Sequence, residues 1–149
     1  MTGLFYGFIY EYYRKFGYKP SDMSSIKYIK PTESELEILQ VLWIKGTASV
    51  RDVHEELSKT KEAGYTTTLK LMQIMHDKGL VKRDDSFKTH IYQAAVTREK
   101  TQRHMLGKMI NTLFGGSATE LVIQALGNHK ASPDELEEIQ KILTEMKNQ

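Results

Sequence analysis

The sequence GYTTTLKLMQIMHDKGLVKR, residues 64–83, contains the point at which the spacing of the apolar residues changes. Over 65–78 the residues suited to burial recur at helical spacing, and Gly79 can close the helix that they predict. The expected buried face consists of Thr68, Leu71, Met72 and Met75. Past Gly79 the spacing becomes two, which predicts a strand over 80–83 and, after a turn, a returning strand over 90–94.

Two further helices are expected before this stretch. The first runs from Thr32 to Lys45, and its start carries a capping box made by Thr32 and Glu35. Residues 47–49 form a short bridge of extended chain. Ser49 can cap a second helix, whose apolar spacing ends before residues 59–61. The order helix, bridge, helix, turn, helix, hairpin is typical of a winged helix-turn-helix. Residues 25–95 are therefore predicted to form a winged-helix DNA-binding domain.

The last third of the sequence predicts three more helices, with starts at Thr97, Ser117 and the Ser132–Pro133 pair. Their apolar stripes consist of Met105, Leu106, Met109, Ile110, Leu113, Phe114, Leu121, Val122, Leu126, Leu136, Ile139, Ile142 and Leu143. So short a segment rarely builds its own core, so we expect residues 96–149 to form a helical dimerisation domain. The fold class is then mostly α with a small β-hairpin wing. A two-fold dimer would suit palindromic DNA.

The region 1–24 is an aromatic N-terminal extension of uncertain status. It is too short and too charged to span a bilayer, which takes about 20 apolar residues. It also lacks the basic start and the cleavage site of a signal peptide. An aromatic arm on the core, an interfacial amphipathic segment, and an upstream start with Met23 as the native beginning all fit it. The first and third interpretations are favoured, and no function is assigned to this region.

The composition narrows the class of protein. With 149 residues, 40% hydrophobic and 27% charged, the chain is an ordinary globular protein, and a net charge of +2 is only mildly basic. There are no cysteines, which excludes disulfides and thiolate metal sites and is compatible with a cytoplasmic protein. The five histidines show no short metal-ligand spacing. Without a phosphate loop or nucleophile elbow, no enzyme, cofactor, metal or small-molecule substrate is expected.

The exposed face of the helix over 65–78 is the candidate DNA-contacting surface. Threonine can hydrogen-bond a base or a phosphate, lysine can reach guanine or a phosphate, and glutamine suits adenine. Tyr65 at the helix start fits two roles, stacking on a sugar or packing against the helix start. The expected contacts on this helix are Tyr65, Thr66, Thr67, Leu69, Lys70 and Gln73.

Basic residues elsewhere suggest contacts to the DNA backbone, which position a protein without reading sequence. The candidates are Arg51 at the start of the second helix and Lys82, Arg83 and Lys88 in the hairpin. Asp84 and Asp85 count against a close approach at the hairpin tip, so we expect these acids to point away. A solvated surface charge explains each basic residue equally well.

Taken in order, the local motifs of residues 31–143 resemble those of the penicillinase repressor family. The matching segments are TESELEIL at 32–39, LW at 42–43, VRDV at 50–53, GYTTTL at 64–69, KGLV at 78–81 and LFGG at 113–116. Each segment is weak alone, but the ordered set is specific. The resemblance implies a winged-helix domain followed by a helical dimerisation domain.

The resemblance also implies a function, a repressor of antibiotic-resistance or stress-response genes that binds operator DNA as a homodimer. Members are often inactivated by a membrane-embedded sensor metalloprotease, whose cut would fall near Gln124 and Ala125 in this sequence. Relatives are cut at an Asn-Phe pair, which this sequence lacks, so the bond and the mechanism stay open. The cysteine-rich tail of copper-responsive members is missing too, which argues against direct metal sensing.

One alternative from another class is a winged-helix module that binds a protein through the exposed face of the helix over 65–78. Salt separates the two hypotheses, because each phosphate contact lowers log K by about 0.9 per decade of salt. An apolar protein interface would respond far less. An enzyme would need a cleft with perturbed titratable groups, for which the sequence gives no sign.

Overall fold

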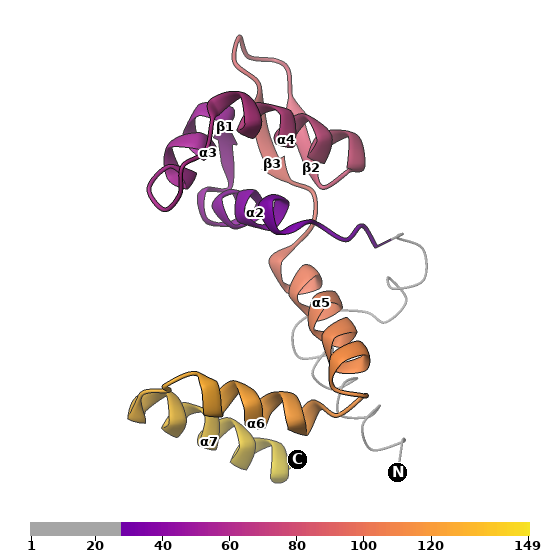
Figure 1. Ribbon diagram of the computed structural model, residues 1–149, viewed down its shortest axis with the longest axis vertical. Coiled ribbons are helices and arrows are strands. Elements are labelled where there is room, and N and C mark those ends of the chain that lie inside the picture. Colours follow the sequence, from indigo (N-terminus) through magenta and orange to yellow (C-terminus); the bar gives the residue numbers. More distant parts are fainter. Residues whose placement is uncertain (1–27) are drawn as a thin grey trace. The chain divides into compact units, whose positions relative to one another are not determined.

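The computed structural model describes residues 28–149, and the chain divides into two compact units with their boundary between Ala95 and Val96 (Figure 1). The aromatic extension over 1–24 lies outside the described residues. The first unit contains α2 (Glu33–Lys45), β1 (Thr47–Ser49), α3 (Val50–Leu57), α4 (Tyr65–Lys78), β2 (Val81–Asp84) and β3 (Ile91–Ala94). This order confirms the predicted fold class, a helix-turn-helix followed by a hairpin wing.

Local capping explains where the first helices begin. The Thr32 hydroxyl accepts a hydrogen bond from the amide of Glu35, whose carboxylate accepts one from the Thr32 amide at 2.8 Å. Ser49 and Asp52 form the same reciprocal box at the start of α3. Each box satisfies amides that the first turn of a helix leaves without partners. Both predicted helix starts are confirmed.

The sheet has one more strand than the sequence predicted. Residues 47–49, expected only as a bridge, pair antiparallel with β3, so that the strand order is β1-β3-β2. Ala48 lies opposite Tyr92, and both side chains are buried. Three residues carry no measurable period, so only the tertiary pairing with β3 makes them a strand. The sequence therefore predicted the extended conformation of these residues but not their pairing with β3.

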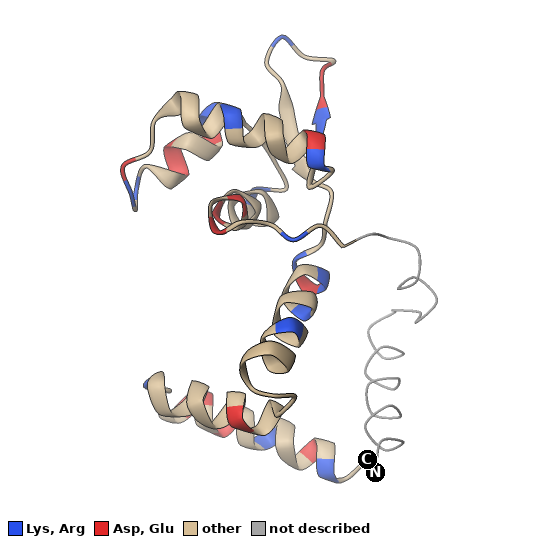
Figure 2. Ribbon diagram, turned by 45° about the vertical axis from the view of Figure 1, so that its right-hand side comes forward, with Lys and Arg blue, Asp and Glu red and all other residues tan. Residues whose placement is uncertain are grey.

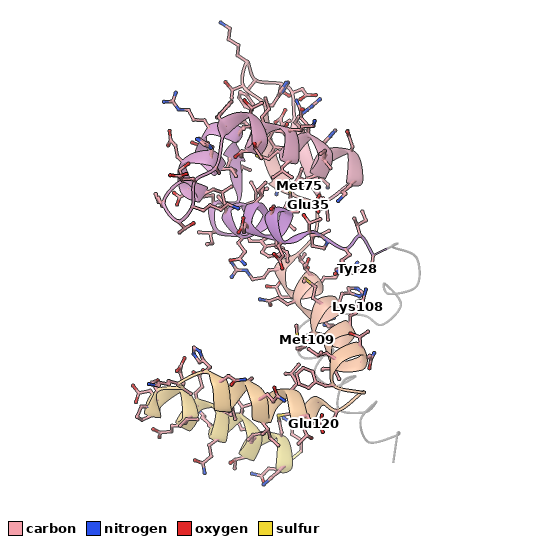
Figure 3. All side chains as sticks on the ribbon, in the orientation of Figure 1. Tyr28, Glu35, Met75, Lys108, Met109 and Glu120 are labelled. Atoms are coloured by element: carbon pink, nitrogen blue, oxygen red, sulfur yellow. The ribbon has the colours of Figure 1, made fainter. Side chains whose placement is uncertain are left out.

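The core of the first unit lies between α2, α3, α4 and the sheet. Its fully buried apolar side chains include Ile38, Leu39, Leu42, Val53, Met72, Met75, Leu80 and Tyr92. Burying a large apolar side chain contributes about 1.5–3 kcal/mol. Figure 3 shows Met75 and Glu35 in the space between α4 and α2. Leu71 was also predicted on the buried face of α4, but it is only half-buried. The fully buried face of this helix is therefore smaller than predicted.

The second unit has no apolar core of its own. It contains α5 (Arg98–Leu113), α6 (Ala118–Asn128) and α7 (Pro133–Lys147), capped by Thr97, Ser117 and Ser132. Among residues 96–149 the single buried residue is Thr101. Helices with one-sided apolar stripes and no buried apolar residue need a further surface to pack against.

No helix within residues 28–149 has both the length and the apolar character that crossing a bilayer requires.

Candidate nucleic-acid interface

Helix α4 separates a buried face from a polar exposed one. Thr68, Met72 and Met75 are buried, and Leu69 is half-buried. The exposed residues of the sequence-predicted contact set on this helix are Tyr65, Thr66, Thr67, Lys70 and Gln73. The structure therefore leaves five of the six expected side chains on α4 exposed, and Leu69 is half-buried.

The start of α4 has no side-chain cap. Gly64 occupies the cap position and offers no hydroxyl or carboxylate, unlike Thr32 and Ser49 at the two preceding helices. The first amides of a helix carry a partial positive charge, and a phosphate is a suitable partner for them. This helix end can therefore accept an anion beside Thr66 and Thr67.

Helix α3 positions the first turn of α4. The rings of His54 and Tyr65 meet edge to face, with centroids 5.5 Å apart and planes at 81°. The His54 Nδ1 atom also lies 3.5 Å from the Thr68 hydroxyl. Tyr65 thus packs against the helix start while remaining 48% exposed, so the structure supports one of its two expected roles and leaves a surface for the other. No local pattern indicated this role of His54, because its partners lie 11 and 14 residues away along the chain.

The last turn of α4 is fixed by an ion pair. The Lys78 ammonium donates to the Glu35 carboxylate at 2.6 Å, and Glu35 is 2% exposed. Burial raises the pKa of Glu35, but hydrogen bonds from Lys78 and Thr32 outweigh it and hold this pKa below its ordinary value. The sequence predicted Glu35 only as a capping residue. A contact between positions 43 residues apart leaves no local pattern.

In the hairpin wing, Lys82 and Lys88 are exposed, whereas Arg83 is half-buried and forms an ion pair with Asp85. Its guanidinium donates to both carboxylate oxygens of Asp85, at 2.6 and 3.2 Å. The hydrogen bond to Asp85, and then that to Tyr92, raises the pKa of Arg83. The sequence did not predict that Asp85 pairs with the arginine two residues earlier.

The remaining predicted residues of the first unit lie on the surface. Arg51 is exposed and forms an ion pair with Glu55 one turn later, at 3.1 Å. The Asp84 carboxylate accepts a hydrogen bond from the amide of Ser86, which tightens the turn of the wing. Figure 2 shows a basic position at the wing tip, and basic and acidic positions next to each other on one of its strands. Within residues 28–149 no three histidine or acidic side chains gather as a metal site would require.

In the second unit, the predicted dimerisation residues are exposed or half-buried. Leu113 is the most open of them at 72% exposure. The exposed ones are Leu106, Met109, Leu113, Val122, Leu126, Leu136, Ile142 and Leu143, and the half-buried ones are Met105, Ile110, Phe114, Leu121 and Ile139. Two further exposed apolar residues extend the same kind of surface: Met146, which continues the stripe of the last helix, and Ile123, which the sequence did not indicate. Gln124 and Ala125 are exposed in the middle of α6.

A helix-turn-helix whose second helix presents a polar face and is followed by a β-hairpin defines the winged-helix class of DNA-binding fold. The chain belongs to the penicillinase repressor family, whose model matches residues 31–145. The family is one of transcriptional repressors rather than of enzymes.

The chain is similar to named members of this family. It is 23% identical over 120 residues to the penicillinase repressor of Staphylococcus aureus, covering 80% of this chain and 95% of that protein. It is 26% identical over 112 residues to the methicillin resistance regulatory protein MecI of Staphylococcus aureus strain N315, covering 75% and 91%.

Among solved structures, the DNA-binding domain of the repressor BlaI matches with a TM-score of 0.44 and 23% identity, covering 49% of this chain and 90% of that one. The monomeric form of Bacillus licheniformis BlaI in complex with the blaP half-operator matches with a TM-score of 0.44 and 22% identity, covering 49% and 89%.

Proposed function

We propose that this chain is a repressor that binds palindromic operator DNA as a homodimer. The observation that carries the proposal is the exposed polar face of α4, formed by Thr66, Thr67, Lys70 and Gln73. This face ends at a helix start without a side-chain cap, and the wing follows it in the chain. Membership of a repressor family supports the same conclusion.

The side chains divide by the part of DNA that each can meet. In a helix-turn-helix the N-terminal part of the second helix meets base edges, which assigns base reading to Thr66, Thr67 and Lys70. Gln73 lies one turn further along and reaches a base or a sugar at the rim of the groove. Arg51, Lys82 and Lys88 supply contacts to phosphates, which fix the position of the protein on the duplex.

The helices α5, α6 and α7 provide the dimer interface in this proposal, with residues 96–149 as the dimerisation domain and 25–95 as the DNA-binding domain. The support is that ten large apolar side chains of α5–α7 are substantially exposed and none is buried. Soluble monomers rarely leave so much apolar surface open. A two-fold pairing would present two α4 helices to two half-sites.

The regulated genes and their induction are proposed from the family. Relatives named penicillinase repressor and methicillin resistance regulatory protein suggest genes for antibiotic resistance as targets. Induction would follow a cut by a membrane-embedded sensor metalloprotease near Gln124 and Ala125. These residues lie in the middle of α6, and proteases bind their substrates extended, so the cut requires local unwinding of this helix.

The test is a titration of the purified protein with the promoter DNA of its own operon, read by fluorescence anisotropy at several salt concentrations. We expect binding that resists competitor DNA and weakens steeply with salt. Footprinting should then show two half-sites about one helical turn apart. A folded, dimeric protein without a specific complex on that promoter would contradict the proposal. Salt-insensitive capture of a protein partner would favour the interaction-module alternative.

A further inference from the structure

The wing carries three basic side chains, Lys82, Arg83 and Lys88, but the structure leaves only the two lysines open to solvent without an ion pair. The Arg83 side chain is 28% exposed, and two of its nitrogens donate to the two oxygens of Asp85. A guanidinium bound in this forked manner to one carboxylate has fewer donors left for a phosphate. The wing therefore contains a cation whose charge is already paired within the protein.

The surroundings of Asp85 hold this pair in place. The His90 Nδ1 atom lies 2.8 Å from the Asp85 oxygen that also receives the Arg83 Nε–H. Arg83 stands directly opposite Tyr92 in the ladder between β2 and β3. Since Tyr92 is buried, the backbone of β3 at this point is fixed against the core. Arg83 is thus attached to the paired part of the hairpin, and Asp85 follows directly after the end of β2.

We propose that Asp85 limits the affinity of the wing for DNA by holding Arg83 away from the phosphate backbone. The inference rests on the proposed function, because it assumes that the wing approaches DNA. A phosphate competing for Arg83 must displace a carboxylate that is tethered two residues away. It would also leave that carboxylate uncompensated next to the DNA, where like charges repel. Lys82 and Lys88 then make the backbone contacts of the wing alone.

The experiment compares Asp85→Asn with Asp84→Asn on the full chain. Both variants remove one negative charge from adjacent positions of the wing, but Asp84 bonds to the Ser86 amide and has no ion pair with Arg83. Arg83→Gln and the Asp85→Asn/Arg83→Gln double variant complete a cycle. Binding is measured on the operon promoter and on a duplex of scrambled sequence over a salt series, and thermal unfolding confirms that each variant folds.

We expect Asp85→Asn to tighten binding to both duplexes about five- to tenfold and to steepen the salt slope by about 0.9, as one added phosphate contact would. Asp84→Asn should give a smaller gain and no comparable change of slope. The double variant should return to the parent affinity, because a neutral pair again occupies the site. If Asp85→Asn unfolds the chain, Asp85→Ser takes its place in the same cycle.

Two results would overturn the inference. One is an Asp85→Asn variant that binds no more tightly than Asp84→Asn. The other is a double variant that binds less tightly than the parent with a shallower slope, which would mean that Arg83 already contacts a phosphate. Failure of the proposed function is distinguishable from both, since the parent protein would then bind neither duplex in a salt-dependent way.

Discussion

The Glu35 carboxylate joins the first turn of α2 to the last turn of α4 through Thr32 and Lys78. It is buried, so its charge is tolerated only because these donors satisfy it. At the other end of α4, His54 contacts Tyr65 and Thr68. Two polar residues that the sequence did not single out as partners of α4 therefore fix both ends of the helix that presents the candidate DNA-contacting face.

Replacing Glu35 with Ala should destabilise the fold by about 1.5–3 kcal/mol at pH 7, because it removes hydrogen bonds to a charged group and leaves a buried space. The pKa of Glu35 is lowered in the folded state, so its stabilisation is complete above the unfolded-state value of about 4.3. It is lost as the pH falls through the folded-state pKa. Urea denaturation of parent and variant between pH 7 and pH 3 measures both effects.

The control for this measurement is Glu33→Ala, which removes an exposed carboxylate from the same turn of α2. Its unfolding free energy should stay within about 0.5 kcal/mol of the parent. A Glu35→Ala variant whose difference from the parent persisted at pH 3 would show that packing, rather than the charge, accounts for the loss.

Lys70 lies on the exposed face of α4, where it can reach a base or a phosphate. Lys70→Ala should weaken specific binding by about 1–3 kcal/mol if it reads a base, with unchanged thermal unfolding. If it contacts a phosphate instead, binding to all sequences falls alike and the salt slope drops by about 1. Anisotropy titrations compare it with Lys147→Ala, the same loss of charge in the other compact unit. Parent-like affinity of Lys70→Ala would exclude Lys70 from the DNA-contacting face.

At the scale of elements, the sequence predicted what is decided locally. Helix starts were found because capping is a contact over three residues, as at Ser49 and Asp52. Strand β1 was missed because its hydrogen bonds go to β3, more than forty residues away. For the candidate interface, helical spacing was enough to predict which side chains of α4 are exposed. The Arg83–Asp85 ion pair was not predictable, because strand periodicity does not say which neighbouring side chains bond to each other.

The junction between α4 and β2 depends on Gly79, whose φ of +83° lies in the left-handed region. Gly79→Ala should cost about 1–2 kcal/mol through backbone strain. The added Cβ would meet the Ile29 side chain only at an ordinary 3.5 Å, so no clash contributes. Gly64→Ala, at a φ of −75°, is the matched control and should be nearly neutral, with 3.7 Å to the nearest atom. Denaturant titration decides, and equal losses in the two variants would contradict the strain argument.

At the scale of the whole molecule, the two compact units differ in how they are stabilised. Within residues 28–95 the structure has a buried core of twelve apolar residues, whereas α5, α6 and α7 have none. The apolar stripes of the last three helices were predictable from their spacing. The sequence could not predict which apolar residues of these helices remain exposed, because exposure depends on how the three helices pack. Ile123, which is exposed, is an example.

Placing a charge in this apolar surface should produce monomers. We expect the Ile110→Asp/Leu113→Asp double variant to halve the molar mass measured by light scattering, because an unpaired charge cannot be buried in an apolar interface without a large cost. The winged-helix unit should keep its unfolding transition. Thr112→Asp/Asn111→Asp on the same helix adds the same charge at exposed polar positions and is the control. A stable dimer in the first variant would place the interface elsewhere.

The open apolar surface of α5–α7 has a consequence for gene dosage. If two chains must meet before either can hold an operator firmly, the competent species grows with the square of the cellular chain number at low abundance. Halving the number of chains in the cell would then lower the dimer concentration about fourfold. A monomer that bound alone would lose only half of its binding-competent molecules. Under the same condition, faster turnover of the chain would lower the dimer concentration more than proportionally.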